Sequence, residues 1–184
     1  MTDQWPKIKG RRTTKLSPWA DIIEREIEFT PGGRPEIYHA VGQPDYIAKL
    51  AMTPDGKSPI VRQYRPALEA FTWELPAGTV DDGESAAQAA SRELMEETGF
   101  PSRTVHALGT FAPCSGRLAN KVHSFFIEAG EKAADHKPEA GIEVRLVTPA
   151  ELVGIIKAGK FDSQQHLGTL LLARLHGVLD LPIA

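Results

Sequence analysis

The sequence contains a single cysteine, Cys114, among its 184 residues. One thiol excludes an internal disulfide and a cysteine-rich zinc site. A role for Cys114 as a nucleophile is disfavoured because no activating base stands near it in the sequence. No apolar run approaches the roughly 18 residues that a membrane span requires, and the N-terminus lacks the apolar stretch of a secretory signal. We therefore expect a cytoplasmic protein with no membrane partner.

Basic residues are not in excess either. The chain has 21 Lys and Arg against 24 Asp and Glu, a net charge of −3, whereas nucleic-acid-binding proteins usually carry a basic balance. Nucleic acid is therefore not an expected partner. One basic cluster lies in residues 7–15, and we interpret it as a solvated N-terminal arm rather than an anion- or RNA-binding tail. The hydrophobic fraction of 41% is enough for one compact domain with a short appendage.

Short β-like runs alternate with helical segments along the chain. The turn sequences Pro31–Arg34 and Thr53–Gly56 predict two hairpins, each between the strands on either side of it. The strands are expected at residues 22–29, 37–41, 46–52, 60–64, 105–111, 122–127 and 144–147. Such a pattern predicts an α+β fold in which helices pack on a mixed β-sheet, or a layered α/β/α domain.

Three helices are expected. The first spans about residues 86–98, where Ser85 can cap the N-terminus, Gln88 can complete a capping box and Gly99 can end the helix. The second spans about 149–158 and begins at Pro149. The third spans about 163–179 and is expected to bury an apolar stripe made of Leu167, Leu170, Leu171, Leu175 and Val178.

Acidic side chains gather on the first helix. Glu93 and Glu97 are four residues apart and share one face, Glu96 lies beside them, and Arg92 lies one turn before Glu96. The loop before the helix adds Asp81, Asp82 and Glu84. Carboxylates so close together either raise one another's pKa or bind cations. Oxygen-only ligands suit Mg²⁺ or Mn²⁺ rather than zinc, which indicates a phosphate ester or anhydride as substrate; the alternative is an acidic helix that simply faces solvent.

The spacing of these residues distinguishes the two interpretations. The segment 78–100 has the form Gly-x5-Glu-x7-Arg-Glu-U-x-Glu-Glu-x-Gly-U, where U is a bulky apolar residue. It matches every fixed position of the Nudix box, at Gly78, Glu84, Arg92, Glu93, Leu94, Glu96, Glu97, Gly99 and Phe100. By ordinary residue frequencies such a match arises by chance on the order of once in ten million chains of this length. The chain thus resembles the Nudix hydrolases over roughly residues 20–175, and the resemblance implies the α/β/α Nudix fold.

The resemblance also implies the roles of individual residues. Glu93, Glu96 and Glu97 would hold Mg²⁺, or Mn²⁺, with the carbonyl of Ala77 as a further ligand, and Arg92 would pair with the glutamates and orient them. Relatives supply a general base, or another metal ligand, from the loop that here spans 136–141. In this chain Ala140 stands where an acid is usual, so Glu139 and, second, Glu143 are the candidates.

Two further segments resemble the ADP-ribose pyrophosphatase branch, namely Val61–Pro66 and Trp73–Gly78, and Pro113 stands near a proline of that branch beyond the box. Arg65 can grip a phosphate oxygen, or be a surface arginine. Glu74 can hydrogen-bond the ribose end, or have no contact with the substrate. Trp19 and Tyr38 match two aromatics that sandwich the base, one from each subunit of a dimer, although packing alone would also explain them.

The expected function is Mg²⁺-dependent hydrolysis of a nucleoside-diphosphate sugar, with ADP-ribose giving AMP and ribose 5-phosphate. The alternatives are GDP-mannose or another nucleotide sugar as substrate, an oxidised-nucleotide housecleaning hydrolase, and a non-catalytic Nudix-like sensor. By resemblance a homodimer is expected. We divide the chain into an N-terminal arm and hairpin, residues 1–45, for dimerisation and base binding, and a Nudix hydrolase domain, residues 46–184.

Overall fold

The computed structural model describes residues 5–137 and 139–182 of the chain. The chain divides into two compact units. One consists of residues up to Pro44 together with Ala112–Lys121, and the other consists of Asp45–Phe111 and the residues from Val122 onward. Segment 112–121 therefore belongs with residues that stand far before it in the sequence.

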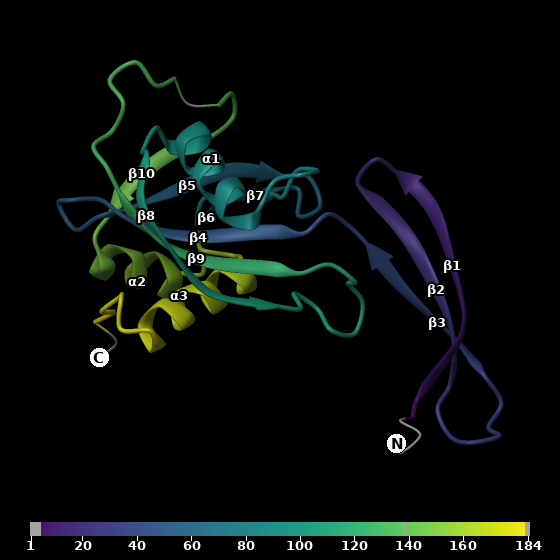
Figure 1. The fold of residues 1–184 in the computed structure, drawn as a ribbon. Coiled ribbons are helices and arrows are strands. Elements are labelled where there is room, and N and C mark those ends of the chain that lie inside the picture. The colour runs from purple at the N-terminus through teal and green to yellow at the C-terminus, as the bar shows by residue number, and fades with distance from the viewer. Residues whose placement is uncertain (1–4, 138, 183–184) are drawn as a thin grey trace. The chain divides into compact units, whose positions relative to one another are not determined.

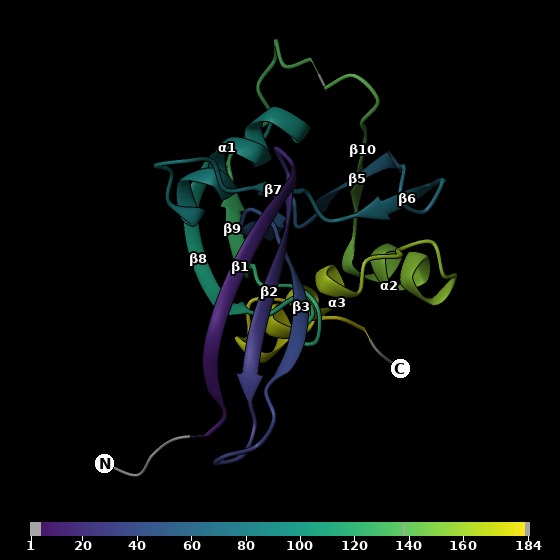
Figure 2. The ribbon, with the colours of Figure 1, turned by 90° about the vertical axis from the view of Figure 1, so that its right-hand side faces the viewer.

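The first unit is an antiparallel sheet of three strands in the order β1 (Lys7–Ser17), β2 (Ala20–Glu28) and β3 (Glu36–Gly42) (Figure 2). The hairpin predicted around Pro31–Arg34 is confirmed, because β2 and β3 pair on either side of it. The basic segment is solvent-exposed as expected, but its description as an arm is wrong for residues 7–15, which form β1. The physical reason is charge complementarity across the ladder, since Lys9 and Arg12 of β1 pair with Glu28 and Glu24 of β2. Residues 1–4 of the expected arm lie outside the described residues.

The second unit contains two sheets and three helices. A mixed sheet has the order β7-β4-β9-β8, with β4 and β9 parallel, and an antiparallel sheet has the order β10-β5-β6. In the residues that the structure describes, no helix is long and apolar enough to cross a lipid bilayer. The elements are β4 (Tyr46–Met52), β5 (Ser58–Arg65), β6 (Ala70–Glu74), β7 (Ala77–Thr79), α1 (Ala86–Thr98), β8 (Ser102–Phe111), β9 (Val122–Ala129), β10 (Glu143–Val147), α2 (Pro149–Lys157) and α3 (Gln164–Leu175).

Helices cover both faces of the mixed sheet (Figure 1). Successive strand residues point to opposite faces, and β4 uses this alternation. Ile47 and Ala51 pack in one apolar cluster with Leu94 of α1, while Leu50 packs in a second cluster with Leu170 of α3. The predicted α+β class and layered α/β/α arrangement are confirmed.

The second predicted hairpin, around Thr53–Gly56, is wrong. A turn does form there, since the Thr53 N–H donates to the Lys57 carbonyl at 2.8 Å. The flanking strands diverge, however: β4 pairs with β7 and β9, and β5 pairs with β6 and β10. Turn residues report only local geometry. The five central residues of β4 are all buried, so this strand takes a central position between two others.

The stripe predicted for the last helix is wrong in part. Leu170 is buried, and Leu167 and Val178 are partly buried. Leu171 and Leu175, in contrast, are 57% and 73% exposed. The inward face of α3 instead carries residues at the i, i+3, i+4 and i+7 positions of one amphipathic face, namely His166, Thr169, Leu170 and Ala173. Two of these four residues are polar, so a search for leucines could not find the face.

Candidate active site

Local signals fix the register of α1. The Ser85 hydroxyl accepts a hydrogen bond from the Gln88 N–H, and the Gln88 side chain accepts one from the Ser85 N–H at 2.9 Å, which confirms the predicted capping box. At the other end Gly99 has φ 78° and donates its N–H to Met95, a left-handed C-terminal cap for which glycine is best suited. The glutamates of α1 therefore have defined positions along the helix.

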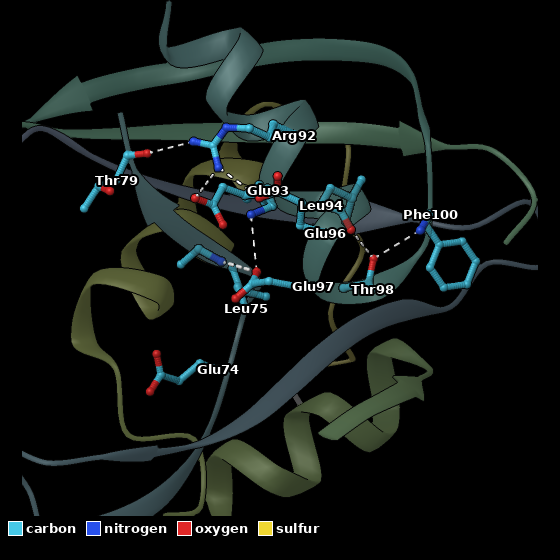
Figure 3. Close-up of polar contacts among 12 residues, drawn as sticks. Glu74, Leu75, Thr79, Arg92, Glu93, Leu94, Glu96, Glu97, Thr98 and Phe100 are labelled. Carbon is cyan, nitrogen blue, oxygen red and sulfur yellow. Dashed lines mark hydrogen bonds and ion pairs between the residues drawn. The ribbon is translucent and has the colours of Figure 1, made fainter. Parts of the chain in front are cut away.

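Arg92 is the centre of a carboxylate cluster (Figure 3). Its guanidinium donates to both oxygens of Glu84 at 3.0 Å, to Glu93 at 2.8 Å and to Glu96 at 3.0 Å, and it also reaches the Thr79 carbonyl. The bonds from Arg92 lower the pKa of Glu84. Burial instead raises the pKa of Glu93, more than Arg92 lowers it. One arginine thus faces more negative charge than it can neutralise.

Glu97 lies deeper than the other acids. Only 4% of the residue is exposed, and its Oε2 accepts a hydrogen bond from the Ala77 N–H at 2.9 Å. Lys49 on β4 is fully buried, and its Nζ lies 3.5 Å from the same oxygen. Burial raises the pKa of Glu97 and lowers the pKa of Lys49, because a low dielectric disfavours both charged forms. The sequence analysis missed Lys49; the signal for it was a charged residue within the otherwise apolar core of a strand.

Position 78 of β7 requires a glycine because the Glu93 side chain approaches its backbone closely. A Cβ added to Gly78 would lie 2.3 Å from Cδ and Oε1 of Glu93, closer than non-bonded atoms can come. The absence of a side chain at this position therefore allows the Glu93 carboxylate to lie directly against the β7 backbone. Ala77, the expected carbonyl ligand, is the neighbouring residue and already contacts Glu97 through its N–H.

The donor set fits Mg²⁺ or Mn²⁺ in kind, because it offers carboxylate and carbonyl oxygens without sulfur. Its geometry is not that of a ready-made cage. Within the described residues no three His, Cys, Asp or Glu side chains are grouped to hold a metal ion. The glutamates instead have basic partners: Arg92 binds Glu93 and Glu96, and Lys49 lies beside Glu97. Among the described residues the buried Lys49 Nζ has no hydrogen-bond partner, and it lies at ion-pair distance from Glu97.

A second charged group lies on the β5–β6 ladder. Arg65 binds Glu74 with two hydrogen bonds of 2.8 and 2.6 Å, and Thr72 also donates to Glu74. Burial would raise the pKa of Glu74, but the bonds from Arg65 and Thr72 outweigh it and hold the pKa below its usual value. The structure therefore brings two of the expected substrate-binding residues together. Glu74 is 4% exposed, whereas the side chain of Arg65 is 36% exposed.

His166 and Tyr46, which were not predicted from the sequence as site residues, extend this group. His166 of α3 is fully buried, and its Nδ1 accepts a hydrogen bond from the Leu75 N–H at 3.2 Å. Burial lowers the pKa of His166 to about 4, so the ring is neutral near pH 7 and its single hydrogen is on Nε2. That Nε2–H donates to the Tyr46 hydroxyl at 2.7 Å. Leu75, three residues before Gly78, is thereby connected to His166 of α3 and, through this ring, to Tyr46 of β4.

The two candidate bases lie apart from the carboxylate cluster in the described contacts. Glu143 begins β10 and forms an ion pair with Arg62 at 3.3 Å. Arg62 lies on the face of β5 opposite to Arg65, because neighbouring residues alternate along a strand. Glu139 is exposed in the loop before β10, where its carbonyl accepts a hydrogen bond from the Ile142 N–H.

The remaining predicted residues, Trp19, Tyr38 and Pro113, belong to the first unit. Trp19 is 67% exposed in the turn between β1 and β2 and lines a pocket of about 330 Å³. Tyr38 pairs with Arg25 on the β2–β3 ladder and donates its hydroxyl to Gly116. Within one chain Trp19 and Tyr38 lie apart along the sheet. The pocket of Trp19 includes Gly42, the last residue of β3, whereas Tyr38 lies near the start of this strand.

Comparisons with known proteins agree with this geometry. The family model of the NUDIX domain matches residues 48–167. The chain is 30% identical to the ADP-ribose pyrophosphatase of Bacillus subtilis (strain 168) over 75% of this chain and 76% of that protein. It is 28% identical to the CMP-5'-(N-acetyl-N-hydroxy-3-aminopropyl)phosphonate hydrolase of Streptomyces rubellomurinus (strain ATCC 31215), over 95% and 85% of the two chains.

A solved structure supports the fold. The crystal structure of an ADP compounds hydrolase superposes with a TM-score of 0.73 and covers 96% of this chain and 98% of the other. Its sequence identity is 20%, so this likeness bears on the fold alone. Together with the family match and the two relatives, it confirms what segment 78–100 predicted. The chain belongs to the Nudix hydrolase superfamily, in its ADP-ribose pyrophosphatase branch.

Proposed function

We propose that this Nudix hydrolase cleaves the pyrophosphate bond of a nucleoside-diphosphate sugar and that ADP-ribose is its best substrate. Water adds to one phosphorus, the bond from phosphorus to the bridging oxygen breaks, and AMP and ribose 5-phosphate leave with release of a proton. The observation that carries the proposal is the excess of carboxylates around Arg92 and Glu97. Similarity to an ADP-ribose pyrophosphatase supports the choice of substrate.

Mg²⁺, or Mn²⁺ in its place, is the proposed cofactor, held by Glu93, Glu96, Glu97 and the carbonyl of Ala77. A divalent cation offsets charge on the phosphoryl oxygens and lowers the pKa of a bound water. The chain's own contribution is to fix where the carboxylates stand: Arg92 holds Glu93 and Glu96, and the Ala77 N–H holds Glu97.

Arg65 is the proposed contact to the pyrophosphate. Its guanidinium is planar and always charged, which suits bidentate binding of phosphate. The two bonds from Glu74 support this role, because they hold the guanidinium in one orientation while part of it stays exposed. We propose that Glu74, which is held by this pairing beside Arg65, contacts the ribose end of the substrate.

Glu139 is the proposed general base. It is exposed, lies in a loop and is free of the ion pair that engages Glu143 with Arg62. A base must come within hydrogen-bond reach of the water that it deprotonates, and an exposed loop residue can do so. Glu143 stays the second candidate.

A homodimer is the proposed assembly, with residues 1–45 as the dimerisation and base-binding region. The first unit supports this, because many of its large apolar side chains are exposed. A three-stranded sheet needs an apolar face covered by other elements to be stable, and a second copy would provide this cover. Trp19 and Tyr38 would then sandwich the base, one from each subunit, and Pro113 is a further proposed substrate-binding residue. A monomer in sedimentation experiments would contradict the proposal. The exposed side chains are Ile8, Leu16, Trp19, Phe29, Ile37 and Tyr38.

The experiment that tests the function is a substrate screen with excess Mg²⁺ that measures the nucleoside monophosphate released. The panel is ADP-ribose, GDP-mannose, UDP-glucose, NADH and 8-oxo-dGDP. We expect the highest kcat/KM with ADP-ribose and loss of turnover when EDTA removes the cation. Binding without turnover of any compound would refute the enzyme and favour a sensor, and preference for 8-oxo-dGDP would favour a housecleaning role.

A second candidate substrate class is a CMP-linked compound. The observation that favours it is the likeness to a hydrolase of a CMP-linked phosphonate, which extends over 95% of this chain. A cytidine analogue of the sugar nucleotide, CDP-ribose, therefore belongs in the same screen. A higher kcat/KM for CDP-ribose than for ADP-ribose would replace adenine with cytosine as the preferred base without changing the reaction.

A further inference from the structure

Lys49 is a buried cation that none of the roles above uses. The residue is fully buried, and its Nζ has no hydrogen-bond partner among the described residues. An ammonium group has three hydrogens to donate, and removing its charge from water is costly unless the charge is paired. Within ion-pair distance among the described residues lies the carboxylate of Glu97, with Oε2 at 3.5 Å from Nζ, and Glu93 also acts on Lys49 electrostatically.

The strand alternation explains why Lys49 reaches this carboxylate. Ile47 and Ala51 of β4 pack in the same cluster as α1, so Lys49, which stands between them, also faces α1. Its backbone N–H donates to the Pro76 carbonyl at 3.3 Å, which ties Lys49 to the residue just before Ala77. Two adjacent strands thus present two groups to Glu97: the Ala77 N–H, which donates a hydrogen bond, and the Lys49 ammonium group, which lies at ion-pair distance.

Both groups approach the same oxygen. The Ala77 N–H lies 2.9 Å and the Lys49 Nζ 3.5 Å from Oε2 of Glu97, and the contacts drawn to Glu97 in Figure 3 end on this one atom. With Oε2 engaged from the sheet side, the position of the carboxylate is restricted, and Oε1 is the oxygen that can take another ligand. Neighbours that orient a metal-ligating side chain are a general feature of metal sites.

We propose that Lys49 is a positioning residue, which holds Oε2 of Glu97 from within the core so that Oε1 binds the divalent cation. This inference rests on the proposed metal-dependent function. It concerns the geometry of Glu97 and does not depend on which nucleotide is cleaved.

Two other roles would give different results. If Lys49 only stabilised the fold, its loss would weaken cation binding whatever residue stands at position 97. If it only repelled a second cation, its loss would strengthen binding, because like charges disfavour each other. A positioning residue acts through its target, so its loss weakens binding only while Glu97 is present.

The test is a double-mutant cycle with Lys49→Met, Glu97→Gln and the combined variant. The Kd for Mn²⁺ alone is measured without substrate, by electron paramagnetic resonance and by calorimetry. We expect Lys49→Met to raise the Kd about tenfold when Glu97 is present, as for the loss of other groups that orient metal ligands. In the Glu97→Gln background the same change is expected to leave the Kd unaltered, and this coupling is what a cycle measures. Lys132→Met, at an exposed lysine, is the matched control and should have no effect in either background.

Lys49→Gln is made alongside in case the methionine variant fails to fold, and it is expected to raise the Kd in the same way. Equal weakening in both backgrounds, tighter binding, or loss of folding in both Lys49 variants would each overturn the proposal. Absence of Mn²⁺ binding by the wild-type protein would also overturn it. Normal Mn²⁺ coupling together with no turnover of any nucleotide would instead refute the proposed function and leave the role of Lys49 intact.

Discussion

Arg92 and Arg65 both bind carboxylates, but in different proportions. Arg92 donates to Glu84, Glu93 and Glu96 on α1 and the loop before it, and Asp81 lies 3.7 Å away, so one positive charge faces four negative ones. Arg65 binds the single carboxylate of Glu74 in a two-bond pair, of which Glu74 is almost fully buried. The first group has unbalanced charge and the second is balanced.

The difference suggests how the two groups are used. A bidentate pair between a buried carboxylate and a partly exposed guanidinium has fixed geometry, which suits a part that orients a substrate. An unbalanced cluster keeps unsatisfied negative charge, and burial raises the pKa of its member Glu93 and of Glu97, which lies next to Glu93. Such a cluster gains most from an added cation. The four predictions below test this assignment, in order of decreasing effect.

The largest effect is expected from Glu97→Gln, which removes a charge next to the unbalanced cluster but keeps the shape of the side chain. We predict a loss of at least about 100-fold in kcat, because the charge that attracts the cation is lost at its most buried position. The assay is steady-state turnover with saturating Mg²⁺. Glu131→Gln, at an exposed acid outside the cluster, is the control. Near-normal Mg²⁺-dependent turnover of Glu97→Gln would contradict the assignment of the cluster.

The next effect concerns His166, which lies beside the balanced pair. Its pKa is lowered to about 4 from 6.5, so between these values the unfolded chain binds a proton that the folded protein does not. Stability is therefore complete above pH 6.5 and falls as the pH falls toward 4, by about 2 kcal/mol at pH 5. His166→Asn keeps an acceptor for the Leu75 N–H and cannot titrate.

We expect the His166→Asn variant to be less stable than wild type at pH 8 but to lose less stability between pH 7 and 5. Urea unfolding across this range measures both quantities. His176→Asn, at the exposed C-terminal cap of the same helix, should keep the wild-type pH dependence. An unchanged slope in His166→Asn would mean that His166 is not a source of the acid sensitivity.

A smaller effect is expected from Gly78→Ala, which displaces a carboxylate without removing charge. The new Cβ would lie 2.3 Å from Glu93, so Glu93 must move away from β7. We predict a fall of about tenfold in kcat, since small displacements of catalytic groups are costly. Gly154→Ala, where the added Cβ meets no atom within 4 Å, is the control. Full activity of Gly78→Ala would show that the position of Glu93 tolerates movement.

The smallest effect is expected from Arg65→Lys on the balanced side. Lysine keeps the charge but cannot form the two parallel bonds to Glu74, so the guanidinium plane is lost. We predict a rise of about fivefold in KM with a smaller change in kcat, the pattern of lost ground-state binding. Arg62→Lys, on the opposite face of the same strand, should alter neither parameter. If Arg65→Lys changed kcat alone, the balanced pair would belong to the chemical step instead of to binding.

Local features of the fold were the most predictable from the sequence. Helix α1 begins and ends where Ser85, Gln88 and Gly99 predict, because caps act on neighbouring residues. Pairing between distant segments was less predictable. The turn at Thr53–Gly56 was found, but the partners of β4 depend on strands that come much later, and β1 was missed because its stability depends on the acids of β2.

The site shows the same division. The spacing of residues 78–100 predicted the family and the glutamates, since all of them lie on one helix and the loop before it. Lys49 and His166 were missed because their chemistry arises from burial beside Glu97 and Leu75, which are far away in the sequence. The pairing of Arg65 with Glu74 was also unforeseen, although both residues had been singled out.

The place of segment 112–121 has a practical consequence for dissecting the protein. Val41 donates its N–H to Arg117 and accepts a hydrogen bond from the Ala119 N–H. A truncation that removes everything before Pro44 would therefore strip an internal segment of its backbone partners, and the exposed groups would have to find water or another chain. The N-terminal region cannot be deleted as an independent tail, and a minimal catalytic fragment would need a shortened connection between β8 and β9 as well.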